Sequence, residues 1–289
     1  MIAHPFTGRC LLVTAMLMAS ATAFADTAQP VKAPTIAKEL QQAKTYTISS
    51  PPTAPLEMPK PALPDLSGYT AAAMEKKIVR KKPGKISIRR MMQEDALKDF
   101  IGGDNKMAEW VVRQHGIPQA IFIDDGYMNL KDLLGKVPKQ YLSETSPGVF
   151  LAKLPIVVGR KGILDIDKQT KELRLSQEAG SFLINDGQLF VRDTKITGWK
   201  EKANGPATFQ SPNEFRPFLL AWGGTETYIA NTKMASFGYA NSKSYGVSIS
   251  QYTPNMAKVL KRSEPTGWII DSELDRKSTR LNSSHRLYL

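Results

Sequence analysis

Short runs of strand-forming residues, repeated through the second half of the chain, constrain its fold more than any other feature. After Pro147 no helical period is found, and the runs VFLAKLPIVV, GILDID, SFLIND, QLFVRDTKITGW and YGVSISQY follow one another, bounded by Gly, Asn, Asp or Pro. Many short strands separated by turn residues are typical of a sandwich, a barrel or a solenoid. The sequence therefore predicts an all-β fold for this part of the chain.

A six-residue pattern that occurs three times favours the solenoid. Its copies read VRDTKI, IANTKM and IIDSEL, and the polar residues at the third position, Asp193, Asn231 and Asp271, are 38 and 40 residues apart. Stacked parallel strands would place these side chains above one another, where Asp and Asn can hydrogen-bond along the stack. We therefore predict the first coils of a parallel β-helix over residues 147–274, with a Greek-key sandwich as the alternative.

The preceding segment, residues 68–146, is expected to form a small α/β cap. Two short strands separated by Pro83-Gly84 are predicted within residues 76–90, followed by a helix from Asp104 to Gly116. A buried strand over residues 120–126 then leads to a short helix whose N-cap is Asn129. The mixture of short strands and helices indicates a cap rather than an independent enzyme domain.

The N-terminal residues have the pattern of a secretory signal peptide. Arg9 precedes an apolar run of about ten residues, and Ala23-Phe24-Ala25 forms a cleavage site before Asp26. The run is too short for a transmembrane helix, which needs about 20 apolar residues. We expect residues 1–25 to be removed on export, and the mature protein not to span a membrane.

Two further segments are not expected to belong to the folded part. Residues 26–67 are rich in Pro and Ala, which favours an extended linker. Residues 275–289 contain DRKSTRLNSSH, which resembles the translation of a widely used sequencing adapter. We expect this C-terminal stretch to be foreign sequence that follows a truncated protein.

The inventory of cysteine and histidine excludes several chemistries. Cys10 is the only cysteine and is expected to leave with the signal peptide. His4 and His285 lie in the signal peptide and the foreign tail, which leaves His115 at the end of a predicted helix, where it is an ordinary terminator. A disulfide, a zinc site and a Cys–His nucleophile pair cannot be assembled from these residues. We expect no metal and no cofactor.

The charge of the chain indicates a polyanionic partner. The formal net charge is +12 at pH 7, and about eight positive charges remain after the signal peptide and tail are removed, enough to attract polyanions. Export argues against nucleic acid and favours an acidic polysaccharide or a membrane surface. A basic protein whose charge serves only solubility is the alternative.

Three segments resemble the mannuronan C5-epimerases of pseudomonad alginate biosynthesis. They are SPGVFLAKLPIVVGRKG, FLLAWGGTETYIANTKMASFGYANSKSYGVSIS and TGWIIDSE, and the resemblance extends through nearly all of residues 26–274. It implies a right-handed parallel β-helix, a periplasmic location and conversion of mannuronate to guluronate within the polymer. It also implies two partners, alginate or polymannuronate as substrate and the periplasmic alginate secretion complex.

The sequence departs from the family in its catalytic motif. The family's Tyr-Gly-Ile-Asp-Pro-His-Asp is not found, and no Asp-Pro-His-Asp occurs in the chain. Epimerisation removes a weakly acidic proton next to a carboxylate, so it needs a group that neutralises the carboxylate and a base. No residue of this chain is therefore assigned a catalytic role, and the chain as written is expected to be inactive.

A substrate-binding ladder is predicted near the end of the folded part. Tyr245-Gly246 begins a run like the family's catalytic rung, and strand alternation places Ser248, Ser250 and Tyr252 on the outer face. Hydroxyl groups on an outer ladder suit sugar binding, and Lys243 could meet a uronate carboxylate. A solvated face without a ligand is the alternative.

Three functions remain open. The first is an epimerase represented by part of its sequence, and the second is a non-catalytic module of the alginate export complex that binds polyuronate or acts as a scaffold. A uronan lyase on the same fold is the third, and it would also need a base and a carboxylate neutraliser.

Overall fold

The structure is a computed structural model that describes residues 65–91, 118–211, 214–238, 245–252 and 254–274. The predicted signal peptide, the helix with His115, Lys243 and the C-terminal tail lie outside these residues, as does nearly all of the predicted linker. Within the described residues no helix is both long enough and apolar enough to cross a membrane.

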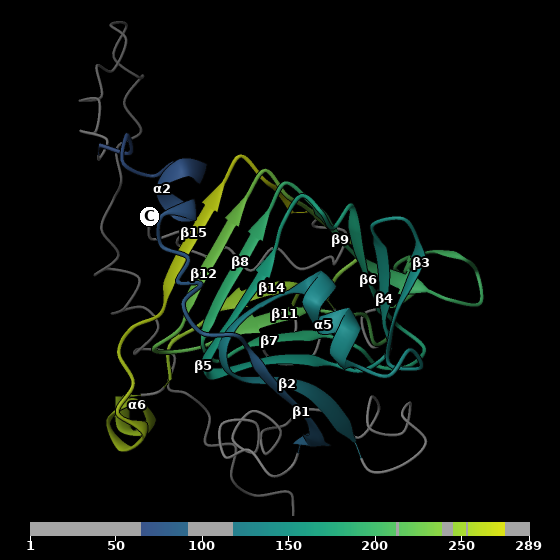
Figure 1. Ribbon diagram of the computed structural model, residues 1–289, viewed down its shortest axis with the longest axis horizontal. Helices are drawn as coiled ribbons and strands as arrows, with labels where there is room; N and C mark the ends of the chain where they lie inside the picture. The colour runs from purple at the N-terminus through teal and green to yellow at the C-terminus, as the bar shows by residue number, and fades with distance from the viewer. Residues whose placement is uncertain (1–64, 92–117, 212–213, 239–244, 253, 275–289) are drawn as a thin grey trace, which may run out of the picture. The chain divides into compact units, whose positions relative to one another are not determined.

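Mostly parallel strands form two sheets, and each sheet draws strands from successive stretches of the chain (Figure 1). The pairs β1–β2, β3–β4 and β9–β10 are antiparallel. Among the described residues the first sheet, called sheet A, has nine strands. Its central order is β14 (Val247–Ile249), β11 (Leu219–Ala221), β7 (Leu183–Asn185), β5 (Ile156–Ile166), β8 (Gln188–Arg192), β12 (Glu226–Ala230) and β15 (Thr266–Ile270). At its N-terminal side β2 (Gln119–Asn129) pairs with β5, and β1 (Lys85–Arg90) pairs with β2.

The second sheet, called sheet B, has seven strands within the described part of the chain. They are β3 (Leu142–Ser146), β4 (Val149–Ala152), β6 (Glu172–Ser176), β9 (Lys195–Lys200), β10 (Gly205–Pro206), β13 (Lys233–Ala235) and β16 (Glu273–Leu274). The helices are α2 (Ala71–Glu75), α5 (Leu130–Lys136) and α6 (Pro254–Leu260).

The path of the chain is that of a solenoid. β7, β8 and β9 follow one another and are repeated one coil later by β11, β12 and β13, then by β14, β15 and β16. The middle strands of the three coils, β8, β12 and β15, pair in parallel without a register shift. The prediction of stacked parallel coils is confirmed, and the sandwich alternative is wrong because a sandwich of this kind has antiparallel strands.

Apolar side chains that point into the coils hold the two sheets together. One row of sheet A consists of Ile121, Ile156, Leu183 and Leu219, all fully buried in one core cluster. Each such side chain contributes about 1.5–3 kcal/mol through burial. Because every coil covers its neighbour, the core runs along the whole described stack.

The helix predicted after Asn129 covers the N-terminal end of this core. The Asn129 side chain accepts a hydrogen bond from the backbone N–H of Asp132 at 2.7 Å, and Leu130 and Leu133 of α5 are buried in the core cluster. The predicted N-cap is confirmed. The strand before it, β2, pairs with β5 in parallel, so sheet A is continuous across the boundary expected near residue 146.

The prediction of two strands around Pro83-Gly84 is only half right. Residues 85–90 form β1, but residues 76–80 form no strand and follow helix α2 instead. Ile78 is buried against the outer face of sheet A beside Met74 of α2, and it therefore serves as an anchor rather than as part of a ladder.

The repeated polar residues form the predicted ladder at the exposed turns where sheet A ends. Asp193, Asn231 and Asp271 follow β8, β12 and β15, and all three have positive φ angles, of 52°, 49° and 45°. The Asn231 side-chain amide donates a hydrogen bond to the Asp193 carboxylate at 2.9 Å. Asn and Asp tolerate this left-handed conformation better than other residues with a Cβ, which explains why the pattern repeats.

Replacing Asn231 by alanine should lower the free energy of unfolding by about 2 kcal/mol, because it removes a hydrogen bond and places alanine in a left-handed conformation. Asn231→Gly loses the same hydrogen bond but adopts the positive φ without strain, so its loss should be less than about 1 kcal/mol. Urea denaturation of the two variants measures the difference. Equal losses would show that the left-handed turn does not select this residue.

Candidate functional site

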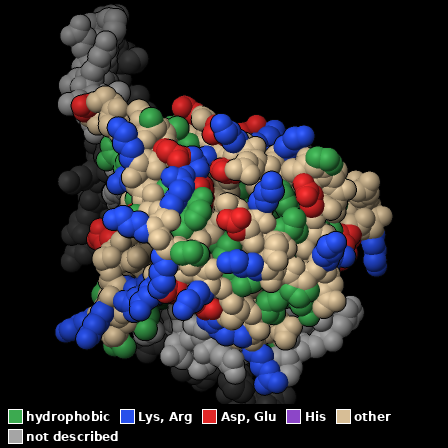
Figure 2. Space-filling model, viewed as in Figure 1, with side chains coloured by type: hydrophobic (Ala, Val, Ile, Leu, Met, Phe, Trp, Pro, Cys, Tyr) green, Lys and Arg blue, Asp and Glu red, His purple; other side chains and the backbone are tan. Residues whose placement is uncertain are grey.

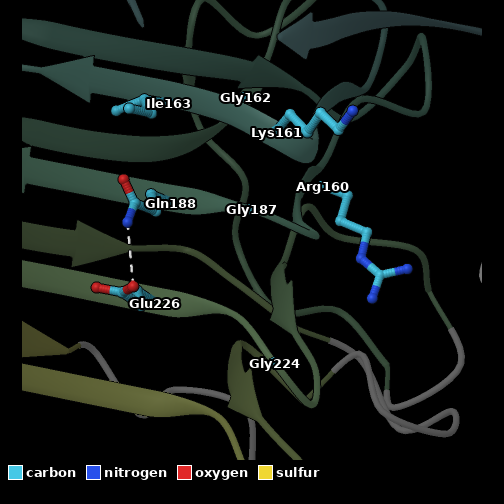
Figure 3. A pocket seen from close by; sticks show the side chains of 8 residues that line it. All are labelled: Arg160, Lys161, Gly162, Ile163, Gly187, Gln188, Gly224 and Glu226. Atoms are coloured by element: carbon cyan, nitrogen blue, oxygen red, sulfur yellow. Dashed lines mark hydrogen bonds between the residues drawn. The ribbon is translucent and has the colours of Figure 1, made fainter. Parts of the chain in front are cut away.

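A groove on the outer face of sheet A lies where the chain passes from one half of the sheet to the other. Its lining comes from β5, from the turn between β7 and β8, and from the turn between β11 and β12 (Figure 3). The lining residues are Arg160, Lys161, Gly162, Ile163, Gly187, Gln188, Gly224 and Glu226. Three successive coils therefore contribute to one site.

Glycines form the floor of the groove because the backbones of neighbouring coils approach too closely for any side chain. A Cβ at Gly162 would lie 2.3 Å from the carbonyl oxygen of Ile123, and one at Gly187 would lie 2.3 Å from that of Gly159. Real Cβ atoms do not come this close to a backbone oxygen. The floor is therefore bare backbone, flanked by the side chains of its neighbours.

Two cations stand at one end of the groove. Arg160 and Lys161 are exposed, and neither makes a hydrogen bond or an ion pair with another residue of the described chain. Both still act on nearby carboxyls, because Arg160 opposes the rise in the pKa of Asp186 and Lys161 helps to lower the pKa of Asp125. Both side chains extend away from the strands in Figure 3. In Figure 2, more Lys and Arg than Asp and Glu side chains cover the viewed face. Because exposed unpaired cations attract anions, this end of the groove can meet a carboxylate.

A carboxylate held by two donors stands at the other end. Gln188 Nε2 donates to Glu226 Oε1 at 3.0 Å, and the hydroxyl of Tyr228 donates to Glu226 Oε2 at 2.6 Å. Burial raises the pKa of Tyr228, with the neighbouring Glu226 adding to the effect, so the phenol stays neutral and remains a donor. The Glu226 carboxylate is therefore fixed in position.

A buried ion pair holds the α6 region beside the groove. The carboxylate of Asp186 accepts a hydrogen bond from Arg262 Nη2 at 2.5 Å and another from the indole N–H of Trp222. Burial raises the pKa of Asp186, while Trp222 and Arg262 oppose the rise. A Cβ at Gly224 would lie 3.1 Å from Cδ of Arg262, so the arginine packs directly along the groove's lining.

Apolar contacts fix the segment around α2, residues 71–80, on the outer face of sheet A. Phe190 and Tyr228 stack on adjacent coils with ring centroids 4.9 Å apart, and the edge of Trp268 follows at 5.2 Å. Met74 of α2 is buried against this row, and Lys77 lies 4.9 Å above the ring of Trp268. Figure 1 shows α2 beside β15 and β12.

A buried carboxylate adds an ionic contact to the same segment. Asp165 is fully buried and accepts hydrogen bonds from Arg192 Nη2 at 2.9 Å, the Tyr127 hydroxyl at 3.0 Å and Arg80 Nη2 at 3.4 Å. Arg192 also pairs with Glu75 of α2. Burial raises the pKa of Asp165 to about 6, against the effects of Tyr127 and Arg80. Residues 71–80 are thus attached to sheet A by apolar contacts and by ionic contacts.

The predicted hydroxyl ladder is on the outer face but is largely covered. Ser248 pairs with Leu220 and continues an apolar row, so it is only 7% exposed. Tyr252 is also 7% exposed and packs against Trp222 in an apolar cluster. The predicted outer-face position is right, but both hydroxyls are covered there, because large apolar side chains occupy the neighbouring coils. Ser250 is half-buried.

A polar atom without a partner is found at two of these positions. The hydroxyl oxygens of Ser248 and Ser250 are buried and have no hydrogen-bond partner among the residues that the structure describes. None of the described ladder residues lines the groove. The substrate-binding roles of Ser248, Ser250, Tyr252 and Lys243 therefore stay predictions. The structure places none of the three described residues, Ser248, Ser250 and Tyr252, in the groove, and Lys243 lies outside the described residues.

The residues of the groove itself were not singled out from the sequence. The available signal was Gly-Arg-Lys-Gly at 159–162, where two glycines flank two cations. Gln188 and Glu226 carried no signal, because they meet only when two coils stack. Within the described residues no group of three or more His, Cys, Asp or Glu side chains is placed to hold a metal ion.

The fold and the groove together define a parallel β-solenoid protein with a groove on the outside of its coils that two exposed cations flank. No protein-family model matches the chain. It is 90% identical to a mannuronan C5-epimerase of Pseudomonas fluorescens over 266 residues, which are 92% of this chain and 50% of that protein. It is 57% identical to the mannuronan C5-epimerase of Pseudomonas aeruginosa over 251 residues, 85% of this chain and 46% of the relative.

A solved structure agrees with these relatives. The crystal structure of the periplasmic alginate epimerase AlgG matches with a TM-score of 0.71 and 68% sequence identity, covering 75% of this chain and 51% of that one. The chain is therefore a homologue of the mannuronan C5-epimerases, and it spans about half the length of the relatives it matches. The resemblance expected from the sequence is confirmed.

Proposed function

We propose that the chain supplies polymer-binding coils of a mannuronan C5-epimerase, which converts mannuronate to guluronate residues within alginate. One observation carries this proposal, namely two exposed cations, Arg160 and Lys161, that form no ion pair within the described residues and lie beside a bare glycine floor in a homologue of these epimerases. An acidic polysaccharide can lie on such a floor while its carboxylates meet the cations.

The dimensions of the solenoid support a polymer as ligand. Neighbouring strands are about 4.8 Å apart along the stack, which is comparable with the length of one sugar residue. A chain of sugars that runs along the solenoid axis would therefore repeat roughly once per coil. Because the groove is built from three successive coils, it offers room for a short run of sugars rather than for a single one.

The chemistry of epimerisation requires a base, and the histidine that the family uses is not among the described residues. A base must take the proton at C5, and a cation must neutralise the adjacent carboxylate. No histidine lies within the described ranges, and the sequence holds no Asp-Pro-His-Asp. We therefore assign binding to this groove and no catalytic step.

Finer features of the family are proposed on the same grounds. The coil is right-handed, as nearly all connections between parallel strands of one sheet are. The solenoid follows a cap over residues 68–146 and a linker over residues 26–67. The protein acts in the periplasm with the alginate secretion complex, and Ser250 and Lys243 contact the polymer, whereas Ser248 and Tyr252 are covered by apolar side chains.

Export should remove residues 1–25, because the signal pattern ends at Ala25. The mass of the protein recovered from the periplasm of an expressing cell measures this directly. A mature protein that begins at Asp26 is the expected result, whereas a periplasmic protein that retains Met1 would contradict it.

A non-catalytic binding or scaffold module is the alternative, favoured by the groove without a base. A chimera separates the two functions. The matched residues of the P. fluorescens relative are replaced by those of this chain, and proton NMR follows guluronate signals in polymannuronate. Retained turnover supports the epimerase assignment. A folded chimera without turnover, with the unaltered relative active under the same conditions, would support the alternative.

The chain alone provides the complementary experiment. Incubated with polymannuronate under the same conditions, it should bind the polymer without producing guluronate signals, because the base is not supplied by the groove. Turnover above that of a blank would show that catalytic residues have been overlooked in this chain.

A further inference from the structure

We propose that Glu226 recognises the hydroxyl groups of the bound sugar and thereby sets the orientation of the polymer in the groove. This inference rests on the proposed function, because it assumes that the groove binds a polyuronate. It assigns the two ends of the groove to different parts of one ligand, with carboxylates at Arg160 and Lys161 and hydroxyls at Glu226.

The hydrogen bonds of Glu226 leave acceptor capacity for a ligand. Each carboxylate oxygen can accept two hydrogen bonds, and the described contacts provide one to each, from Gln188 at 3.0 Å and from Tyr228 at 2.6 Å. Glu226 is half-buried and lines the groove. Since a carboxylate only accepts, the complementary ligand group is a donor such as a hydroxyl.

The surroundings keep this acceptor fixed in position. Tyr228 is only 1% exposed, and its burial raises the pKa of the phenol, so the Tyr228 hydroxyl continues to donate. The Tyr228 ring is held between Phe190 and Trp268 on the adjacent coils. A side chain whose donors are themselves packed in place loses little conformational freedom when a ligand binds.

The negative charge of Glu226 repels ligand carboxylates, whereas its oxygens attract ligand hydroxyl groups. A carboxylate of the polymer is repelled by Glu226 and attracted by Arg160 and Lys161, which extend to the other side of the glycine floor (Figure 3). A sugar that has a carboxylate on one side and hydroxyls on the other fits this arrangement in one orientation. Simple attraction of polyanions would instead be strengthened by removing Glu226.

The two effects can be separated, because removing the charge of Glu226 should weaken the binding of a ligand with hydroxyls and should not weaken the binding of one without them. The variant Glu226→Gln keeps the shape of the side chain but removes the charge and one acceptor oxygen. Two ligands of similar charge are titrated into the chain by calorimetry at low salt. One is a mannuronate hexamer, which has hydroxyls and carboxylates, and the other is an acrylate oligomer with carboxylates and no hydroxyls.

Glu226→Gln should weaken binding of the mannuronate hexamer about tenfold, as expected for loss of hydrogen bonds to a charged group. Binding of the acrylate oligomer should be unchanged or tighter. Glu273→Gln is the matched control, because Glu273 is 63% exposed and lies on sheet B, away from the groove. It should change neither affinity by more than about twofold, since distant exposed charges are screened. Thermal unfolding verifies that both variants fold.

Two failures have different meanings. If Glu226→Gln binds both ligands as well as or better than the unaltered chain does, Glu226 does not bind the hydroxyl groups of the sugar. The inference is then overturned, but the proposal that the groove binds a polyuronate is not. If the unaltered folded chain binds neither ligand, the proposed polyuronate-binding function itself is wrong.

Discussion

Arg192→Leu should lower the free energy of unfolding by about 3–5 kcal/mol, the usual effect of removing one partner of a buried ion pair. The Arg192 side chain is 14% exposed, and the Asp165 side chain that it contacts is fully buried. Without the guanidinium, the partners that Asp165 retains among the described residues are the Tyr127 hydroxyl and the longer contact to Arg80. Urea denaturation at pH 8 measures the loss.

The control is Lys233→Leu, which breaks an exposed pair with Glu273 and should cost less than about 1 kcal/mol. The loss in Arg192→Leu should also shrink at pH 5. The pKa of Asp165 is already raised to about 6 with its partners present, and in the variant it should be higher still. The folded variant then takes up a proton that the unfolded chain does not, so its stability rises as the pH falls from 8 to 5. Equal losses in the two variants would contradict the role assigned to Asp165.

The double variant Arg160→Ala, Lys161→Ala should bind polymannuronate about 100-fold more weakly at low salt. A hydrogen bond to a charged group contributes about 1.5–3 kcal/mol, and each 1.4 kcal/mol corresponds to a factor of about ten. Both residues are exposed on the groove, so their removal should leave the fold intact. Equilibrium binding in dilute buffer measures the effect.

The matched control removes the same charge from the other sheet. Lys195 and Lys233 pair on adjacent coils of sheet B, and Lys195→Ala, Lys233→Ala should weaken binding less than about threefold, because charges beyond about 10 Å are screened at 0.1 M salt. Their ion pairs with Glu172 and Glu273 are lost, so thermal unfolding is measured in parallel. If the two double variants bind equally weakly, net charge rather than the groove determines affinity.

The features that could be predicted from the sequence are those that repeat or depend on local chemistry. Asp193, Asn231 and Asp271 recur because each coil makes the same turn with a positive φ. Since this conformation favours Asn and Asp, the sequence repeats these residue types once per coil. Asn129 was identified as an N-cap because capping depends on neighbours only three residues away.

The features that could not be predicted depend on contacts between coils or with covering segments. Gln188 and Glu226 are 38 residues apart and meet only through the register of β8 and β12. Alternation placed Ser248 on the outer face correctly, but it carries no information about what lies over that face, and the row of Leu220 is apolar. The strand predicted at Ile78 is wrong because a buried β-branched residue between exposed basic residues gives the same alternating pattern in a strand and in a loop that one side chain anchors.

The central claim is that these coils bind an acidic sugar polymer through its carboxylates, and calorimetry with a matched pair of ligands tests it most directly. The mannuronate hexamer is compared with mannohexaose, the same sugar chain in which hydroxymethyl groups replace the carboxylates. At low salt the hexamer should bind, and its affinity should fall as salt is added because the attraction to Arg160 and Lys161 is screened. Mannohexaose should show no measurable binding. Equal affinities for the two ligands, or binding of the neutral one alone, would contradict the account.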